Sequence, residues 1–359
     1  MIPVSSSSHS SPPGCDCGGD DDEKLLSLSY NQECDCFSAG TSGGFRIYNC
    51  DPFEEKLRRD VKGSGGFKVV EMLFRSNIFA LVGSASNSQF SPNKVIIWDD
   101  HQSRCLGEFS FRSDICGVKL RRDRIVIVLQ HKIYVYNFMD LKLIRTIETL
   151  ANPKGLCRLS QHANTSVLAC PGIKRGHVRV EHFGLDAVKI IKAHESHIAF
   201  LTLTTDGLLL STASSRGTLI RIFNTLDGGC LQEVRRGGEQ AEIYGIAFSM
   251  DVQWLAVSSN KGTVHVFSLR VFCRSISVQR GLLPNFTCKK KSPFLCHLGF
   301  IILWRWSAWM EGDVIFIVVF CLIFCLEYSY YRCSFDVVNG GEMKQVEYSR
   351  FMKDSGKFS

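Results

Sequence analysis

An internal repeat constrains the fold of this chain more than any other feature of its sequence. The segments 198–223 and 243–267 carry the same residue types at four places, with a spacing of 45 residues between partners: Asp206 and Asp251, Ser214 and Ser259, Gly217 and Gly262, Thr218 and Thr263. In each segment an Asp turn precedes an apolar strand, and a Gly turn leads into the next strand. A period of about 40 to 45 residues with four short strands is typical of one β-propeller blade.

The rest of the chain continues the β pattern. Short runs that alternate polar and apolar residues, as half-buried strands do, are separated by turns, and few helices are indicated. Three earlier segments at similar spacing resemble degenerate blades: 69–99, 118–138 and 156–183. The sequence therefore predicts an all-β, mostly antiparallel propeller. The repeats alone favour a plain scaffold without a ligand, because a fold does not fix a function.

Sixteen cysteines raise the question of a metal site or disulfides. The first 14 residues are polar and Ser-rich, without the apolar core of a secretory signal, so a cytoplasmic chain with reduced thiols is expected. Cys15-x-Cys17 and Cys34-x-Cys36 lack the usual C-x2-C spacing, and no His pair follows at ligand spacing. We therefore expect no metal and no cofactor, and interpret most cysteines as small core residues.

The motif Val234-Arg235-Arg236-Gly237 lies between the two clear repeats. Adjacent side chains of an extended backbone point to opposite faces, so the two arginines can serve two separate pockets. Arginine suits phosphate because its planar fork donates two parallel hydrogen bonds, and Gly237 permits a sharp turn behind the pair. The alternative is a solvated basic pair with no ligand.

Small hydroxyl side chains, Gly turns and possible cations flank the motif on both sides. They are Thr212, Ser214, Gly217, Thr218 and Arg221 before it, and Ser259, Thr263 and His265 after it. Hydroxyl and N–H groups can bind phosphate oxygens, and Arg or protonated His supplies charge. His194 and His197 also lie near the first group in sequence. The net charge of +7 agrees with an anionic surface as partner but is weakly informative.

The Arg-Arg-Gly motif between two blades resembles the signature of the PROPPIN family, which includes the animal WIPI proteins and their yeast and plant relatives. Segments 44–53, 93–100 and 152–157 resemble the plant branch. The resemblance is dense over 25–269 and returns over 331–352. Val234 departs from the aromatic residue or Leu that usually precedes the arginines, and we expect it to pack inward.

The resemblance implies a seven-bladed, WD-repeat-like propeller that binds phosphatidylinositol 3-phosphate and 3,5-bisphosphate. Carried over, the first pocket takes Arg235 and the second takes Arg236 and Gly237, each with the flanking residues on its side. The implied role is a peripheral adaptor in autophagosome formation and in vacuolar and endosomal traffic. The implied partners are these lipids and proteins of the autophagy machinery, and no nucleic acid. The implied locations are preautophagosomal, endosomal and vacuolar membranes.

Residues 271–330 depart from the family pattern, so blades six and seven are expected to be disrupted or divergent. The stretch 314–326 is almost wholly apolar but shorter than the roughly 20 residues of a membrane-spanning helix. A divergent blade core, a misassembled coding sequence, a membrane-inserting stretch and a transmembrane helix remain open for it. The expected organisation is a disordered tail (1–23), blades one to part of six (24–270), the divergent segment (271–330), terminal strands (331–352) and a tail (353–359).

Two other functions compete with lipid binding. One is a WD-repeat scaffold for proteins, or a truncated form without function. The other is an enzyme, but the sequence shows no nucleophile elbow, P-loop, His-rich metal cluster or dinucleotide loop. We therefore expect no catalytic residues.

Overall fold

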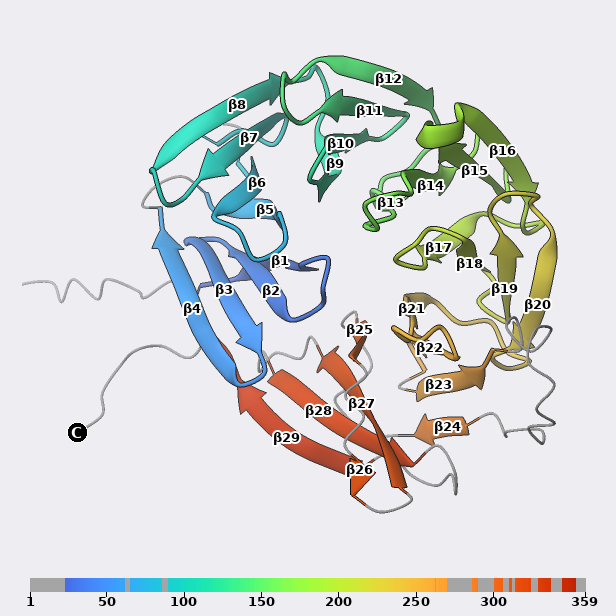
Figure 1. Ribbon diagram of the computed structural model, residues 1–359. Helices are drawn as coiled ribbons and strands as arrows, with labels where there is room; N and C mark the ends of the chain where they lie inside the picture. Colours follow the sequence, from blue (N-terminus) through green and yellow to red (C-terminus); the bar gives the residue numbers. More distant parts are fainter. Residues whose placement is uncertain are drawn as a thin grey trace, which may run out of the picture.

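The computed structural model describes residues 23–61, 65–85, 90–261, 263–269 and 351–352, together with strands between 286 and 350. In this part of the chain the strands form sheets that follow one another around a ring (Figure 1). The only helix there is one 3-10 turn, η1 (Phe183–Leu185). The predicted all-β propeller is confirmed.

The described strands form seven antiparallel sheets, of which six have four strands each. The first two contain β1 (Leu25–Tyr30), β2 (Cys36–Thr41), β3 (Gly44–Cys50), β4 (Phe53–Asp60), β5 (Phe67–Met72), β6 (Ile78–Gly83), β7 (Lys94–Asp99) and β8 (Arg104–Ser110). The next two contain β9 (Ile115–Arg121), β10 (Arg124–Leu129), β11 (Lys132–Asn137), β12 (Leu143–Glu148), β13 (Arg158–Leu159), β14 (Val167–Pro171), β15 (His177–His182) and β16 (Ala187–Lys192). The fifth and sixth contain β17 (Ile198–Leu203), β18 (Leu209–Ser214), β19 (Leu219–Asn224), β20 (Cys230–Arg235), β21 (Ile243–Phe248), β22 (Trp254–Ser259), β23 (Thr263–Ser268) and β24 (Phe286–Lys289).

The last sheet is larger and departs from the regular blade. It contains β25 (Phe300–Arg305), β26 (Met310–Glu311), β27 (Val314–Ile323), β28 (Ser329–Asp336) and β29 (Lys344–Arg350). The described residues thus form six regular four-stranded blades, one fewer than the seven expected, and a five-stranded sheet in the remaining place. The difference arises because β27 is ten residues long and pairs with β26 as well as with β25 and β28.

The apolar stretch 314–326 contributes β27, an inner strand of this last sheet. Figure 1 shows the sheet between the β21–β24 blade and the first blade. No helix among the described residues is long and apolar enough to cross a membrane. The predicted tails fall almost entirely outside the described residues.

The core lies between neighbouring blades, where their facing side chains form separate hydrophobic clusters. One cluster joins the second and third blades around Ile97, Leu120 and Ile127. Another joins the fifth and sixth around Ile222 and Leu255. This arrangement follows from the alternation of each strand, since both faces of an inner blade are covered and contribute apolar residues.

The 45-residue repeat is reproduced in hydrogen bonds as well as in sequence. The hydroxyl group of Thr204 donates to Asp206 Oδ1 over 2.5 Å, and the equivalent Ser249 donates to Asp251 Oδ1 over 2.6 Å. Each Asp also accepts a backbone N–H two residues later. The predicted blade repeat is therefore confirmed as a structural one, although Gly262 lies outside the described residues.

Aromatic packing joins the last sheet to the first. Tyr330 of β28 has no exposed surface, and its ring stacks on Phe53 at a centroid distance of 4.6 Å. Its hydroxyl donates to the Cys50 carbonyl oxygen over 3.1 Å. Phe351 packs edge-on against Phe37 at 5.7 Å. On its other side, the last sheet places β25 beside β21 and β22, so the ring is continuous.

Candidate functional site

The predicted site lies where the fifth blade passes the chain to the sixth. It comprises the β18–β19 turn, the end of β20 and the link from β20 to β21 (Figure 1). Gly217 forms the turn, with φ of +64°, and its N–H donates to the Ser214 carbonyl oxygen over 2.9 Å. A Cβ atom at this position would lie 1.9 Å from the Ala241 carbonyl oxygen. Glycine is therefore required, because the turn and the link touch through their backbones.

The two adjacent arginines have different environments. Val234 is buried in the cluster shared by the fifth and sixth blades, so its predicted inward packing is confirmed. Arg235 points to the other face, is exposed, and makes no hydrogen bond or ion pair with any described residue. Its guanidinium is thus available to a ligand in solution.

Arg236 is only 8% exposed. Its Nε donates to the Gly217 carbonyl oxygen and its Nη2 to the Glu239 carbonyl oxygen, each over 2.6 Å. Burial lowers the pKa of Arg236, while the nearby Glu239 carboxylate opposes that shift. Arg236 stays charged at neutral pH because the unperturbed pKa of arginine is far higher. It therefore fixes the turn and the link to each other.

The residues predicted for the first pocket lie on one side of the fifth blade, but the hydroxyls are largely enclosed. Thr212 has no exposed surface, and its Oγ1 lies 3.0 Å from His194 Nε2. Ser214 is also buried, while Thr218 is partly exposed. Arg221 Nη1 donates to the Ala193 carbonyl oxygen over 2.6 Å. The first pocket was predicted to contain two cations, Arg221 and Arg235. Arg235 is exposed and Arg221 is partly exposed.

An acidic side chain competes for that cation. Arg221 Nε donates to Glu233 Oε2 over 2.7 Å, and both side chains are partly exposed. Glu233 precedes Arg235 by two residues on β20, so the two side chains share a face. Sequence reasoning missed Glu233, although its place two residues before Arg235 was a usable signal.

The residues predicted for the second pocket lie at the facing end of the sixth blade. Ser259 has no exposed surface, and its Oγ lacks a hydrogen-bond partner among the described residues. Thr263 Oγ1 lies 3.1 Å from His265 Nε2, and the His265 ring stacks with Phe267. Around Gly237 there is open space where a side chain would stand. In this structure Arg236 bonds to Gly217, assigned to the first pocket, and no described contact joins it to these second-pocket residues.

A cavity of 220 Å³ adjoins the first group on the side of the fourth blade. Ser215, the neighbour of Ser214, lines it together with four basic or titratable side chains: Lys154, Lys174, His177 and His197. None of the described residues that line this cavity is acidic. His197 was noticed for its position in sequence, but the others come from the start of β15, from the loop before it and from the link between the third and fourth blades, which only the fold brings near. Lys154 is paired with Glu242 over 2.8 Å, so Lys174 is the lysine of this lining that has no ion-pair partner among the described residues.

Buried His194 should make the fold sensitive to acid. Burial, with a further contribution from Arg221, lowers the pKa of His194 from 6.5 to about 4. The unfolded chain then binds more protons than the folded chain between these values, so His194 contributes stability above pH 6.5 that is lost as pH falls toward 4. We expect roughly 2–3 kcal/mol less unfolding free energy at pH 4.5 than at pH 7.5 from this residue. Urea unfolding of the wild type and of His194→Gln should show it. An equal acid loss in both proteins would contradict the assignment.

No group of His, Cys, Asp and Glu among the described residues could hold a metal ion. Of the four cysteines singled out in sequence, Cys15 and Cys17 lie outside those residues, and Cys36 is buried in the core between the first and second blades.

The sequence and the fold of this chain were compared with those of known proteins. The PROPPIN family model matches residues 24–283, which include every predicted site residue. Autophagy-related protein 18e of Arabidopsis thaliana is 45% identical over 342 residues, covering 92% of this chain and 88% of the relative. Kluyveromyces lactis Hsv2 superimposes with a TM-score of 0.72 at 22% identity, over 91% of this chain and 99% of that one. KlAtg21, solved in complex with the coiled coil of AgAtg16, gives a TM-score of 0.72 at 25% identity over 91% and 99% of the two chains. The chain therefore belongs to the PROPPIN family.

Proposed function

We propose that this protein is an adaptor that binds phosphatidylinositol 3-phosphate and 3,5-bisphosphate in membranes and acts in autophagosome formation. The family membership and a 45%-identical relative named for autophagy support this role. The single observation that carries the lipid site is the exposed Arg235, without a described partner, next to Arg236, which is held by backbone carbonyl groups. A charged fork with no ligand of its own is suited to a phosphate group.

The division between the two arginines supports two roles within the same motif. Arg235 can bind phosphate on the side of the fourth blade, where Arg221 and the cavity with Lys174 and His197 lie. Arg236 faces the sixth blade and needs only to exchange a carbonyl partner to reach a second headgroup near Thr263 and His265. Each hydrogen bond to a charged group is worth about 1.5–3 kcal/mol, which gives modest affinity per pocket. Two pockets on one membrane surface strengthen each other through effective concentration.

The wider role follows from the same assignment. We take the five-stranded last sheet as a divergent seventh blade of the propeller. The partners would be the lipids and proteins of the autophagy machinery, and the complex of KlAtg21 with a coiled coil supports a coiled-coil segment as one partner type. The protein would act at preautophagosomal, endosomal and vacuolar membranes as a peripheral adaptor without catalysis.

Flotation with liposomes of defined composition tests the proposal. Vesicles containing phosphatidylinositol 3-phosphate or 3,5-bisphosphate should carry the full chain upward, and vesicles with unphosphorylated phosphatidylinositol should not. Anionic vesicles with phosphatidylserine at equal charge serve as the control for nonspecific attraction. Weak binding that ignores lipid phosphorylation and disappears in high salt would instead indicate a scaffold without a lipid site.

Removal of the competing carboxylate should strengthen lipid binding. In Glu233→Gln, Arg221 loses an ion-pair partner and the face of Arg235 loses a negative charge. Because the pair is partly exposed and screened, we expect a gain of about 0.5–1 kcal/mol, or roughly two- to fivefold in affinity. Vesicle titration measures it, and Glu108→Gln, which removes a similar exposed pair with Lys94 on the second blade, is the matched control. Unchanged or weaker binding would place the phosphate elsewhere.

A further inference from the structure

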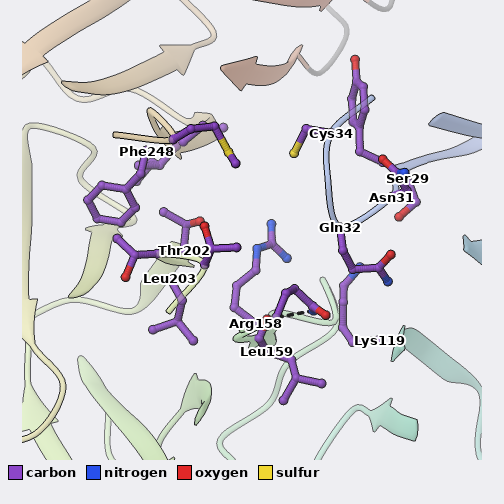
Figure 2. Close-up of a pocket in the computed structure, with 18 of the residues that line it drawn as sticks. Ser29, Asn31, Gln32, Cys34, Lys119, Arg158, Leu159, Thr202, Leu203 and Phe248 are labelled. Atoms are coloured by element: carbon purple, nitrogen blue, oxygen red, sulfur yellow. Dashed lines mark hydrogen bonds between the residues drawn. The ribbon is translucent and has the colours of Figure 1, made fainter. Parts of the chain in front are cut away.

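The centre of the ring contains a cavity distinct from the lipid site. Its volume is 510 Å³, far above the roughly 10–15 Å³ that one water molecule requires. The inner strands β1, β5, β9, β13, β17 and β21 all contribute to its lining. Figure 2 shows the side chain of Arg158, from β13, extending into this space between Thr202 and Gln32.

Arg158 has no ion-pair partner among the described residues. Its Nη1 donates one hydrogen bond, to the Cys157 carbonyl oxygen over 3.1 Å. Its guanidinium lies over the Phe200 ring, 5.3 Å from the centroid. Burial lowers the pKa of Arg158, which means that desolvation of its charge is not fully offset. Most of its donors therefore remain without a protein acceptor.

The charges around the cavity do not balance. Among the described residues that line the cavity, Glu71 is the only acidic one. Its carboxylate already accepts from Lys119 Nζ over 2.8 Å and from Ser29 Oγ over 2.6 Å. One positive charge, that of Arg158, is left over in the channel. An unpaired charge in a sheltered site is costly, and a bound anion would remove that cost.

The neighbouring polar groups favour an anion as well. The side-chain hydroxyls of Thr202 and Thr205 line the cavity and have no described hydrogen-bond partner. The amide of Gln32 is already committed, since Nε2 donates to the Met72 and Leu120 carbonyl oxygens. Arg158 and the two threonines thus offer donors to the cavity that no described residue accepts.

We propose that the central channel binds the phosphate group of a small water-soluble molecule, with Arg158 as its main ligand. The planar fork of Arg158 matches two oxygens of a tetrahedral phosphate, and the Thr202 hydroxyl donates to a third. Inorganic phosphate and phosphate monoesters share this chemistry.

The channel site is separate from the paired arginines. Thr204 and Thr205 follow the end of β17, whereas the Gly217 turn follows the end of β18. Because β17 and β18 are antiparallel, these two turns lie at opposite ends of the blade. The proposal does not depend on lipid binding, and variants of the two sites can be tested independently.

Thermal unfolding of the full chain, followed as phosphate is titrated against chloride at equal ionic strength, tests the proposal. Because the paired arginines can also bind phosphate, the comparison is made without them. The melting temperature of Arg235→Thr/Arg236→Thr should rise with saturation, whereas that of the same variant with Arg158→Met added should not. A parallel series with glycerol 3-phosphate distinguishes a monoester from the inorganic ion as the preferred ligand. Arg158→Lys keeps the charge without the fork and should bind phosphate at least about tenfold more weakly.

The direction in which Arg158→Met changes stability, with and without phosphate, distinguishes phosphate binding from a structural role of Arg158. Without phosphate, Arg158→Met should be at least as stable as the wild type, because the unpaired charge is gone. In saturating phosphate, the order should reverse. A variant less stable than the wild type in both buffers would make Arg158 purely structural. A phosphate response that survives when Arg158→Met is added to Arg235→Thr/Arg236→Thr, or that is already lost in Arg235→Thr/Arg236→Thr, would overturn the channel site.

Discussion

Arg235→Thr/Arg236→Thr should lose at least about a hundredfold in affinity for vesicles that contain phosphatidylinositol 3-phosphate. The loss combines two charge-assisted contacts, each worth about 1.5–3 kcal/mol. The two single variants should differ in stability. The exposed side chain of Arg235 makes no hydrogen bond or ion pair with the described residues, so Arg235→Thr should unfold like the wild type. Arg236→Thr should be less stable by about 1–3 kcal/mol, because the carbonyl groups of Gly217 and Glu239 lose their donor.

Vesicle titration and urea unfolding on the same preparations separate the two effects. Arg104→Thr/Arg112→Thr is the matched control, since both arginines are exposed on the second-blade side and the net charge falls equally. Binding by the Arg235 and Arg236 double variant at wild-type strength would refute the lipid site. Equal losses in the control would show that general charge, and not the motif, attracts the membrane.

Tyr330→Ala should cost about 3–5 kcal/mol of unfolding free energy, the usual effect of emptying a large aromatic site. Tyr330 is fully buried, stacks on Phe53 and donates to the Cys50 carbonyl oxygen, so its removal leaves a cavity and an acceptor without its donor. Tyr330→Phe keeps the stacking and should cost about 1 kcal/mol, the net worth of one hydrogen bond.

Urea unfolding at fixed pH measures both changes. Met139→Ala, which truncates a side chain that is 85% exposed, provides a control that should stay near the wild type. If Tyr330→Ala unfolds at the wild-type midpoint, the last sheet does not hold the ring closed. In that case the segment after 270 contributes little to the fold.

Much of the fold could be predicted from local patterns. The Asp and Gly turns of the repeat predicted the blade period. The alternation of the strand correctly predicted that Val234 packs inward while Arg235 points to the other face. The apolar stretch at 314–326 could not be assigned, because a continuous apolar run without alternation fits a buried strand and a helix equally well. Its residues 314–323 pair with β25 and β28 and so form a strand.

The candidate site was predictable in location but not in its contacts. Arg236 is held by backbone carbonyl oxygens, and every residue carries one, so sequence gives no sign of that partner. Lys174 and His177 reach the site from another blade, and that neighbourhood exists only in the folded ring. The burial of Thr212 against His194 likewise depends on packing and not on residue type.

The aromatic contact between the first and last sheets also has a consequence for how the chain is made. Tyr330 and Cys50 are 280 residues apart, whereas the strands of each blade are near neighbours in sequence. At about 5–20 residues per second, a ribosome needs roughly 15 to 60 seconds between these two positions. During that time the first blade is formed but its flank of Phe37, Tyr48 and Phe53 faces water. Nascent chains should therefore be bound by chaperones at this flank. Chaperone binding should end only when Phe351 has emerged from the ribosome and can cover the flank.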